Sequence, residues 1–251
     1  MLKVSSFLRL SGGSLGDTTF LKVKGEYTAR NKKVVNPKKF KTDPKLARVR
    51  ENSGDFTMAA KSGKLVRNSI EPISPEIKEG TVTRRLLTEM MRVIKSDVIS
   101  TAGNGNVRDG NYKLLIGFNF NINSRLRAAF NVNYTTEINR ETGDLIINIP
   151  SFNPATNIKA PAGATHYKIS SAGIAVDFVS LKKPKAAFFT SPLLPIDGNN
   201  TVALTISNNV SVGAQDRVFL TLGIQFFKVA GQWMSNVSNN SGDCMAIVDA
   251  G

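Results

Sequence analysis

Residues 132–149, VNYTTEINRETGDLIINI, decide the fold class of this chain. Apolar or β-branched residues alternate with polar ones on both sides of the turn sequence RETGD, at Val132, Tyr134, Thr136 and Ile138 and then at Leu145, Ile147 and Ile149. A period of two places successive side chains on opposite faces of a strand. The stretch therefore predicts an antiparallel hairpin with one buried and one solvated face.

The same alternation recurs over residues 111–251. It predicts strands at 114–122, at 167–178 with a bulge at 171–173, at 202–206 and at 218–226, with weaker strands at 186–190 and 244–248. In the first of these the residues expected on the buried face are Leu114, Ile116, Phe118, Phe120 and Ile122. About eight strands at this spacing are typical of an antiparallel β-sandwich, either a jelly roll or an immunoglobulin-like fold.

Two helices are expected before this β-rich body. Asp43 and Pro44 predict a helix start, because Asp caps free backbone N–H groups and Pro fits the first turn. The helix runs to about Ile70, and its expected packing stripe is Val49, Phe56, Ala59, Gly63, Val66 and Ile70. Its glycines weaken the helix by about 1 kcal/mol each, so it needs a partner surface that approaches closely.

The second helix is expected from about Thr81 to Ile99. Its inner face consists of Val82, Leu86, Met90, Ile94 and Val98. Residues 101–111 are rich in Gly and Asn and have no apolar period, which indicates a boundary. The fold class is thus α+β, mainly β, with three predicted regions: a basic arm with a short hairpin at 1–42, a helical region at 43–110 and an antiparallel β-sandwich at 111–251.

The arm carries most of the net charge. Residues 1–70 have a net charge of +11, residues 71–110 are neutral and residues 111–251 carry +3. Residues 16–33 predict a hairpin around the turn at Gly25, and residues 31–41 predict an extended linker. Between Lys22 and Arg50, eleven basic residues accompany only Glu26 and Asp43.

Such a density of positive charge binds phosphates by releasing counterions. Phe20, Tyr27 and Phe40 lie among these charges, where they are available to stack on bases. The tract has no base-reading motif, so contact with an acidic surface of a neighbouring subunit, or plain solvation, stays open. The candidate contact residues are Lys22, Lys24, Arg30, Lys32, Lys33, Lys38, Lys39, Lys41, Lys45, Arg48 and Arg50, and the candidates for packing between subunits are Phe20, Tyr27, Phe56 and Gly63.

No motif indicates catalysis. Residues 12–16, GGSLG, match a nucleophile elbow, but the residues after them have the pattern of a strand and the chain has a single histidine. That residue, His166, is expected on a solvated face without partners for a metal site. Glu137, Glu141 and Asp144 flank or occupy a turn, and the fragments beginning at Asn104 and Asp197 lack the spacing of a calcium loop. We expect no enzyme activity, no cofactor, no metal and no small-molecule substrate.

The single cysteine, Cys244, excludes an intramolecular disulfide. The sequence lacks the apolar region of a signal peptide and any run of about 18 apolar residues, so synthesis in the cytoplasm and no membrane span are expected. The final location is expected to be an assembled particle, such as a virion.

Two stretches carry a resemblance, residues 16–33 in the arm and residues 160–170, APAGATHYKIS, in the body. They are similar to uncharacterised proteins of Bacteroidota genomes and their mobile elements. The resemblance implies no activity and no site residues. It favours a phage or bacterial assembly component.

Three functions are therefore considered. The first is a non-enzymatic structural subunit that self-assembles into a virion shell, a tail component or a filament, because the arm cannot bury itself and its ordering is coupled to docking. The second is a nucleic-acid-binding protein that uses residues 22–50. The third is a carbohydrate-binding β-sandwich module, which depends only on Trp233 and exposed aromatic residues.

Overall fold

The computed structural model describes residues 13–23, 25–31, 37–73, 80–237 and 242–251. The chain divides into two compact units, residues 1–50 and 51–251. Strands make up 35% of the structure and helices 27%, so the chain is mainly β, as predicted. The strand pairs of the described residues are antiparallel.

The first unit holds a small sheet and the start of a helical segment. Its elements are β1 (Gly13–Leu15), β2 (Thr18–Val23), β3 (Glu26–Asn31), α1 (Pro37–Thr42) and the 3-10 turn η1 (Pro44–Leu46), and α2 (Ala47–Ser69) begins in it. The predicted hairpin at 16–33 is confirmed as β2 and β3. The expected extended linker at 31–41 is wrong from residue 37 onwards, where Pro37 occupies the first position of α1 and its fixed φ suits a helix start.

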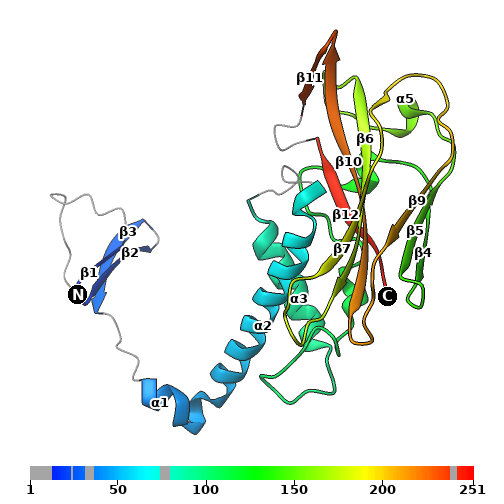
Figure 1. Cartoon of the computed structure of the whole chain (residues 1–251). Coiled ribbons are helices and arrows are strands. Elements are labelled where there is room, and N and C mark those ends of the chain that lie inside the picture. Colours follow the sequence, from blue (N-terminus) through cyan, green and yellow to red (C-terminus); the bar gives the residue numbers. More distant parts are fainter. Residues whose placement is uncertain (1–12, 24, 32–36, 74–79, 238–241) are drawn as a thin grey trace. The chain divides into compact units, whose positions relative to one another are not determined.

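The second unit contains two sheets (Figure 1). The larger sheet has the order β11-β10-β6-β7, with β12 also paired to β10 and β8 to β6. Its strands are β6 (His166–Val176), β7 (Lys185–Thr190), β8 (Leu194–Pro195), β10 (Arg217–Ala230), β11 (Trp233–Asn236) and β12 (Cys244–Ala250). The smaller sheet has the order β4-β5-β9, with β4 (Thr135–Asn139), β5 (Asp144–Ile149) and β9 (Leu204–Asn209). The predicted hairpin at 132–149 is confirmed as β4 and β5.

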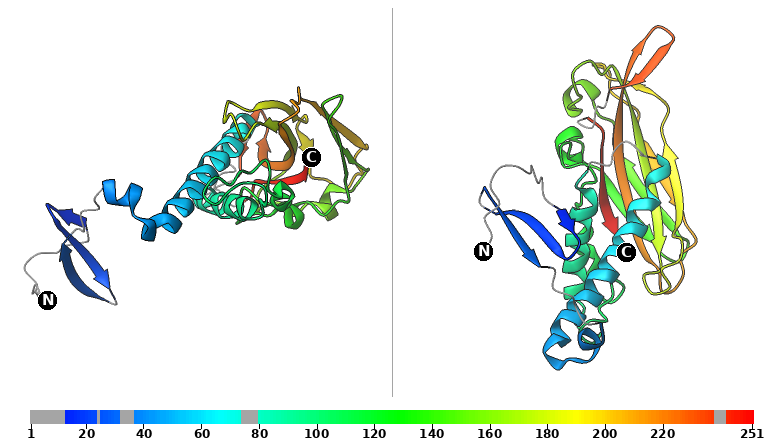
Figure 2. Two further views of the ribbon diagram at one scale, coloured as in Figure 1. Left: turned by 90° about the horizontal axis from the view of Figure 1, so that it is seen from below. Right: turned by 90° about the vertical axis from the view of Figure 1, so that its left-hand side faces the viewer.

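The helical segments α2, η2, α3 and η3 lie against one face of the larger sheet, and the smaller sheet lies on the other side (Figure 2). Their bounds are Glu71–Ile73 for the 3-10 turn η2, Val82–Lys95 for α3 and Tyr112–Leu115 for the 3-10 turn η3. The short helices α4 (Leu126–Ala129) and α5 (Pro154–Asn157) belong to the side of the smaller sheet, because α4 and the residues that flank α5 pack with side chains of that sheet. One core joins Val66, Leu86 and Met90 of the helices to Ile174 and Phe219 of the sheet. The helical region and the β body therefore share a core.

A second core fills the space between the two sheets. It contains Ile147 and Ile206 from the smaller sheet and Tyr167, Leu220 and Leu222 from the larger one. Residues 169–176 of β6 and 218–224 of β10 are thus buried on both faces, whereas the sequence predicted one solvated face. The larger sheet curls into a half-barrel.

The two predicted helices are confirmed, but each packing stripe is shorter than expected. Ala59, Gly63, Val66 and Ile70 are buried, whereas Val49 and Phe56 are 49% and 52% exposed. In the same way α3 buries Leu86, Met90 and Ile94 but ends at Lys95, and Val98 beyond it is 92% exposed. In both helices the apolar pattern of the sequence therefore extends beyond the residues that pack against another element.

The strand predicted at 114–122 is wrong. Residues 112–115 form η3, and Gly117 has a φ of 87°, which interrupts an extended chain. Only the backbone around Phe118 and Phe120 runs beside β12, through bonds such as Phe120 N–H to the Met245 carbonyl at 2.9 Å. Leu114, Ile116 and Ile122, expected inside, are 39%, 42% and 43% exposed.

Two smaller expectations in the β body are also corrected. The bulge predicted at 171–173 is absent, because β6 pairs with β10 in continuous register from His166 to Val176. The irregularity lies instead between Leu220 and Thr221, where β10 pairs with β12. The strand predicted to begin at Val202 begins at Leu204, and Val202 is 88% exposed.

A pair of substitutions tests where the second helix packs. Leu86→Ala removes a fully buried side chain that contacts Gly63, so we expect the free energy of unfolding to fall by about 2–5 kcal/mol. Val98→Ala removes an exposed side chain of the same predicted stripe and is expected to change it by less than about 0.5 kcal/mol. Urea denaturation measures both. Equal losses in the two variants would contradict the packing described here.

Candidate interaction surface

The N-terminal sheet is built from two tight turns. Gly16 and Gly25 have φ values of 54° and 89°, a region that glycine adopts without strain, and they connect β1 to β2 and β2 to β3. The register pairs Lys22 with Tyr27, and the Lys22 Nζ lies 5.4 Å from the centre of the Tyr27 ring. The hairpin therefore presents a cation and an aromatic ring side by side.

The segment after the sheet is held together by polar contacts. Asp43 accepts a hydrogen bond of 2.9 Å from the Lys45 backbone N–H, and Pro44 follows it at the first position, which confirms the predicted helix start. The Arg50 guanidinium donates at 2.9 Å to the carbonyls of both Phe40 and Asp43. Arg50, predicted as a contact residue, thus ties α1 to the start of α2.

Over residues 13–23, 25–31 and 37–50, no side chain is buried. Each strand and helix of this segment is exposed or half-buried along its whole length. Phe20 is half-buried, Tyr27 is 48% exposed and Leu15 is 76% exposed. The described part of the first unit has no hydrophobic core of its own.

The predicted contact residues fall into three groups. Lys22, Arg30, Lys38, Lys39, Lys41, Lys45 and Arg48 are exposed, and Arg50 is half-buried. Lys39 also lies 4.0 Å from the Asp43 carboxylate. Lys24, Lys32 and Lys33 lie outside the described residues.

The remaining packing candidates belong to α2. Phe56 is 52% exposed. Gly63 is buried against its own chain, since a Cβ at this position would lie 3.5 Å from the Leu86 Cγ. The close approach that the sequence predicted for Gly63 is therefore made within the subunit, to α3.

The second unit presents an amphipathic groove of about 470 Å³ between α3 and residues 114–125. Leu114, Ile116 and Ile122 line it together with Arg92 and Arg125. The sequence missed this surface, because the alternation at 114–122 indicated burial. A larger groove of about 770 Å³ lies between the end of α2 and β7, with Phe188 on its wall.

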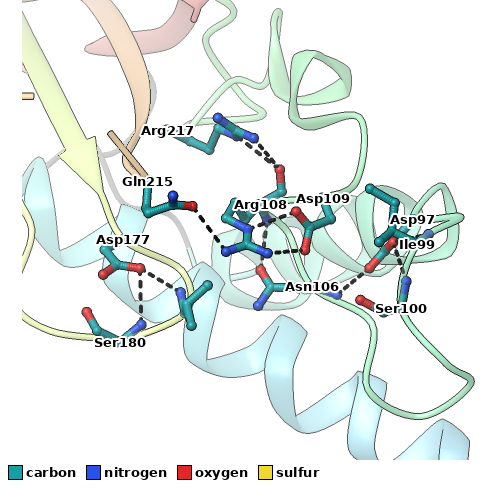
Figure 3. Close-up of polar contacts among 11 residues, drawn as sticks. Asp97, Ile99, Ser100, Asn106, Arg108, Asp109, Asp177, Ser180, Gln215 and Arg217 are labelled. Carbon is teal, nitrogen blue, oxygen red and sulfur yellow. Dashed lines mark hydrogen bonds and ion pairs between the residues drawn. The ribbon is translucent and has the colours of Figure 1, made fainter. Parts of the chain in front are cut away.

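A polar network holds the loop between α3 and η3 against the sheet (Figure 3). The Arg108 guanidinium binds both carboxylate oxygens of Asp109 at 2.8 Å and donates to Gln215 at 3.1 Å. Arg217 donates through two nitrogens to the Arg108 carbonyl, at 3.0 and 2.8 Å. These residues bind one another, and the network positions the loop.

Asp97 closes the same loop. Its carboxylate accepts hydrogen bonds from the backbone N–H groups of Ile99, Ser100 and Asn106 at 2.8–3.0 Å. Partial burial raises the pKa of this carboxyl, but the N–H donors of Ser100 and Asn106 outweigh it and lower the pKa to about 2.

The side chains that catalysis would use first are the cysteine, the histidine and Ser14. Burial raises the pKa of the Cys244 thiol to about 12, so it is neutral and unreactive at pH 7. His166 is half-buried, with its Nδ1 2.9 Å from the Thr165 hydroxyl. Ser14 lies in β1 and is followed by β2, not by the helix that a nucleophile elbow requires. Among the described residues, no three His, Cys, Asp or Glu side chains gather as metal ligands would.

Comparisons with protein-family models, with curated proteins and with solved structures found no match to this chain. They leave the resemblance to Bacteroidota and phage-associated proteins as an expectation. No helix in the described ranges has both the length and the apolarity to cross a bilayer.

The role of Asp97 predicts a pH dependence of stability. A carboxyl in an unfolded chain has a pKa of about 3.9, so a folded pKa of about 2 stabilises the fold above pH 4, and the contribution is lost as the pH falls towards 2. Because Asp97 is partly solvated, we expect Asp97→Asn to cost about 1 kcal/mol at pH 6 and only a small fraction of that at pH 2, where the carboxyl is half protonated in the folded state. Denaturation curves at both pH values measure this.

The matched control is Glu141→Gln, an exposed side chain at the turn between β4 and β5. A cost for Asp97→Asn that is the same at pH 6 and pH 2 would show that the charge has no part in holding the loop.

Proposed function

We propose that this chain is a non-enzymatic structural subunit that self-assembles into a larger particle, such as a virion shell, a tail component or a filament. The N-terminal unit contacts neighbouring subunits or nucleic acid in the assembly. The observation that carries the proposal is the lack of any buried side chain over the described part of residues 13–50.

The energetics of a small exposed sheet support this role. Ordering one residue costs about 1–2 kcal/mol of conformational entropy, and small sheets need a hydrophobic face packed on a partner to repay it. β2 and β3 have no such partner among the described residues of their unit. A surface outside the unit that covers Phe20, Tyr27 and Leu15 would supply the missing burial, so folding of the hairpin would be coupled to docking.

The body supplies the self-supporting part of the proposed subunit. We take it to be a β-sandwich in which β4, β5 and β9 pack across the core from the curled larger sheet. The Asn208 side chain on β9 donates to the Ser171 hydroxyl on β6 at 2.8 Å, a buried hydrogen bond between the two sheets. Both cores lie in residues 51–251, so the body has what a stable shell component needs.

Sedimentation velocity and light scattering over a range of protein concentrations test the proposal. The measured mass of the full-length protein is expected to rise with concentration above the monomer mass of 27.2 kDa. A chain lacking residues 1–31 removes the small sheet and keeps both cores, so it is expected to stay folded and to lose the largest species. A full chain that remains monomeric at every concentration would contradict the proposal.

Nucleic-acid binding is the second candidate, and the exposure of seven predicted basic contact residues favours it. The net charge of +14 also means that two copies repel each other, whereas a polyanion attracts both. Binding of this kind is independent of base sequence, and it weakens steeply with added salt because the release of counterions into a more concentrated solution gains less entropy.

A salt series with a duplex DNA and a single-stranded RNA, followed by fluorescence anisotropy, tests this candidate. Replacing Lys41, Lys45 and Arg48 by Ala is expected to reduce the slope of log K against log salt by about 3, near 1 for each lost phosphate contact. The matched control replaces three exposed body lysines, Lys113, Lys159 and Lys228, and is expected to leave the slope unchanged. No affinity at low salt, or equal effects of the two triple variants, would remove the candidate.

A further inference from the structure

The end of β10 extends beyond the larger sheet. β10 pairs with β12 as far as Ile224 and with β6 as far as Phe227, and residues 227–230 pair with β11. The turn between them contains Gly231, with a φ of 61°. Figure 1 shows this β10–β11 hairpin projecting past the other strands of the body.

The hairpin carries large apolar side chains into solvent. Trp233, the single tryptophan of the chain, is 83% exposed, and its neighbour Met234 is 54% exposed. All four residues of β11 are exposed. A two-stranded hairpin is marginal in water, and exposed Trp and Met side chains are the kind that dominate protein interfaces when they are covered.

Among the described strands, only β10 pairs with β11, so no described strand pairs with the other edge of β11. Its sequence, WMSN, contains no charged residue and no proline, and these are the devices that keep an edge strand from pairing with another chain. The other edges of the described body differ from it. Lys183 and Pro184 precede β7, which begins with Lys185, and β4 carries Glu137. β9 lies beside β7, and the backbone around Phe118 runs beside β12.

We propose that β11 pairs with β11 of a second copy of this chain, antiparallel and about a two-fold axis. This inference rests on the proposed function and names one of the contacts by which copies of the subunit meet. Pairing a strand with itself about a two-fold axis presents the same patch on both sides, so it needs no second complementary site. The contact extends the larger sheet across two molecules and covers Trp233 and Met234.

The charge distribution is compatible with a second copy as the partner of β11. Two chains that each carry +14 repel over most of their surfaces, so a contact between them is favoured where charge is lowest. β11 is neutral, and the nearest cation on the hairpin, Lys228, belongs to β10, on the side of β11 away from the open edge in the pairing order. Two four-residue strands make less than the about 800 Å² per partner of a standard interface. Association through this contact is therefore weak.

The single tryptophan makes the test direct. The emission of Trp233 in the full chain is measured from low to high micromolar concentration beside the mass from sedimentation. We expect the emission to move to shorter wavelengths over the same concentrations at which the mass doubles. Met234→Lys keeps the reporter and places a charge at the edge, and it is expected to weaken association by about tenfold or more.

The matched control is Val98→Lys, a charge placed at a site that is 92% exposed and lies outside β11. It is expected to associate as the wild-type chain does. Circular dichroism of both variants at low concentration confirms that the monomers are folded.

Three results would overturn the inference. If the chain assembles while the emission stays constant and Met234→Lys assembles normally, this contact is wrong and the proposed function stands. If the mass stays that of a monomer throughout, both the contact and the proposed function fail. If the emission of the monomer shifts only on addition of cellohexaose, Trp233 belongs to a carbohydrate site and not to a contact between copies.

Discussion

The pairing of β6 with β10 is the interaction on which the rest of residues 51–251 depends. Eleven residues of β6 pair with β10 without interruption, and side chains on both faces of this ladder are buried. One face receives α2 and α3 and the other receives β5 and β9. At Gly173 a Cβ would lie 2.9 Å from the Asn208 Cβ, so only glycine allows the smaller sheet to approach this closely. Loss of this ladder would remove the surface that both cores share.

Nothing comparable supports the described part of residues 13–50. The Lys22 and Tyr27 contact and the Arg50 hydrogen bonds order short stretches, but interactions at the surface are worth only about 1 kcal/mol each. Burial of apolar area is what repays conformational entropy in a small element, and it is missing here. Residues 51–251 thus contain their own cores, whereas the described part of the N-terminal unit contains none. This contrast is the physical basis for proposing a subunit whose N-terminal unit is buried only on assembly.

Local signals in the sequence predicted most of the elements. The alternation at 132–149, the cap at Asp43 and the apolar stripe of α3 depend on nearby residues, and the structure confirms each. The failures have a common cause, since they required knowledge of distant neighbours. Residues 114–122 have a strand-like period, but Gly117 interrupts it and β12 accepts only part of the segment. Val98 continues a helical stripe after α3 has ended. The exposed position of Trp233 could not be predicted from the sequence either. It depends on where β6 and β12 end their pairing with β10, at Phe227 and Ile224.

The proposed subunit requires that the N-terminal unit is stabilised by a surface outside itself. Hydrogen exchange of the full chain, measured on the monomer and on the assembled form, tests this most directly. We expect the amides of β2 and β3 to exchange in the monomer nearly as fast as those of an unfolded chain, while those of β6 and β10 are strongly protected. In the assembly, β2 and β3 become protected as well. Strong protection of β2 and β3 in the isolated monomer would show that the N-terminal unit is stable without a partner.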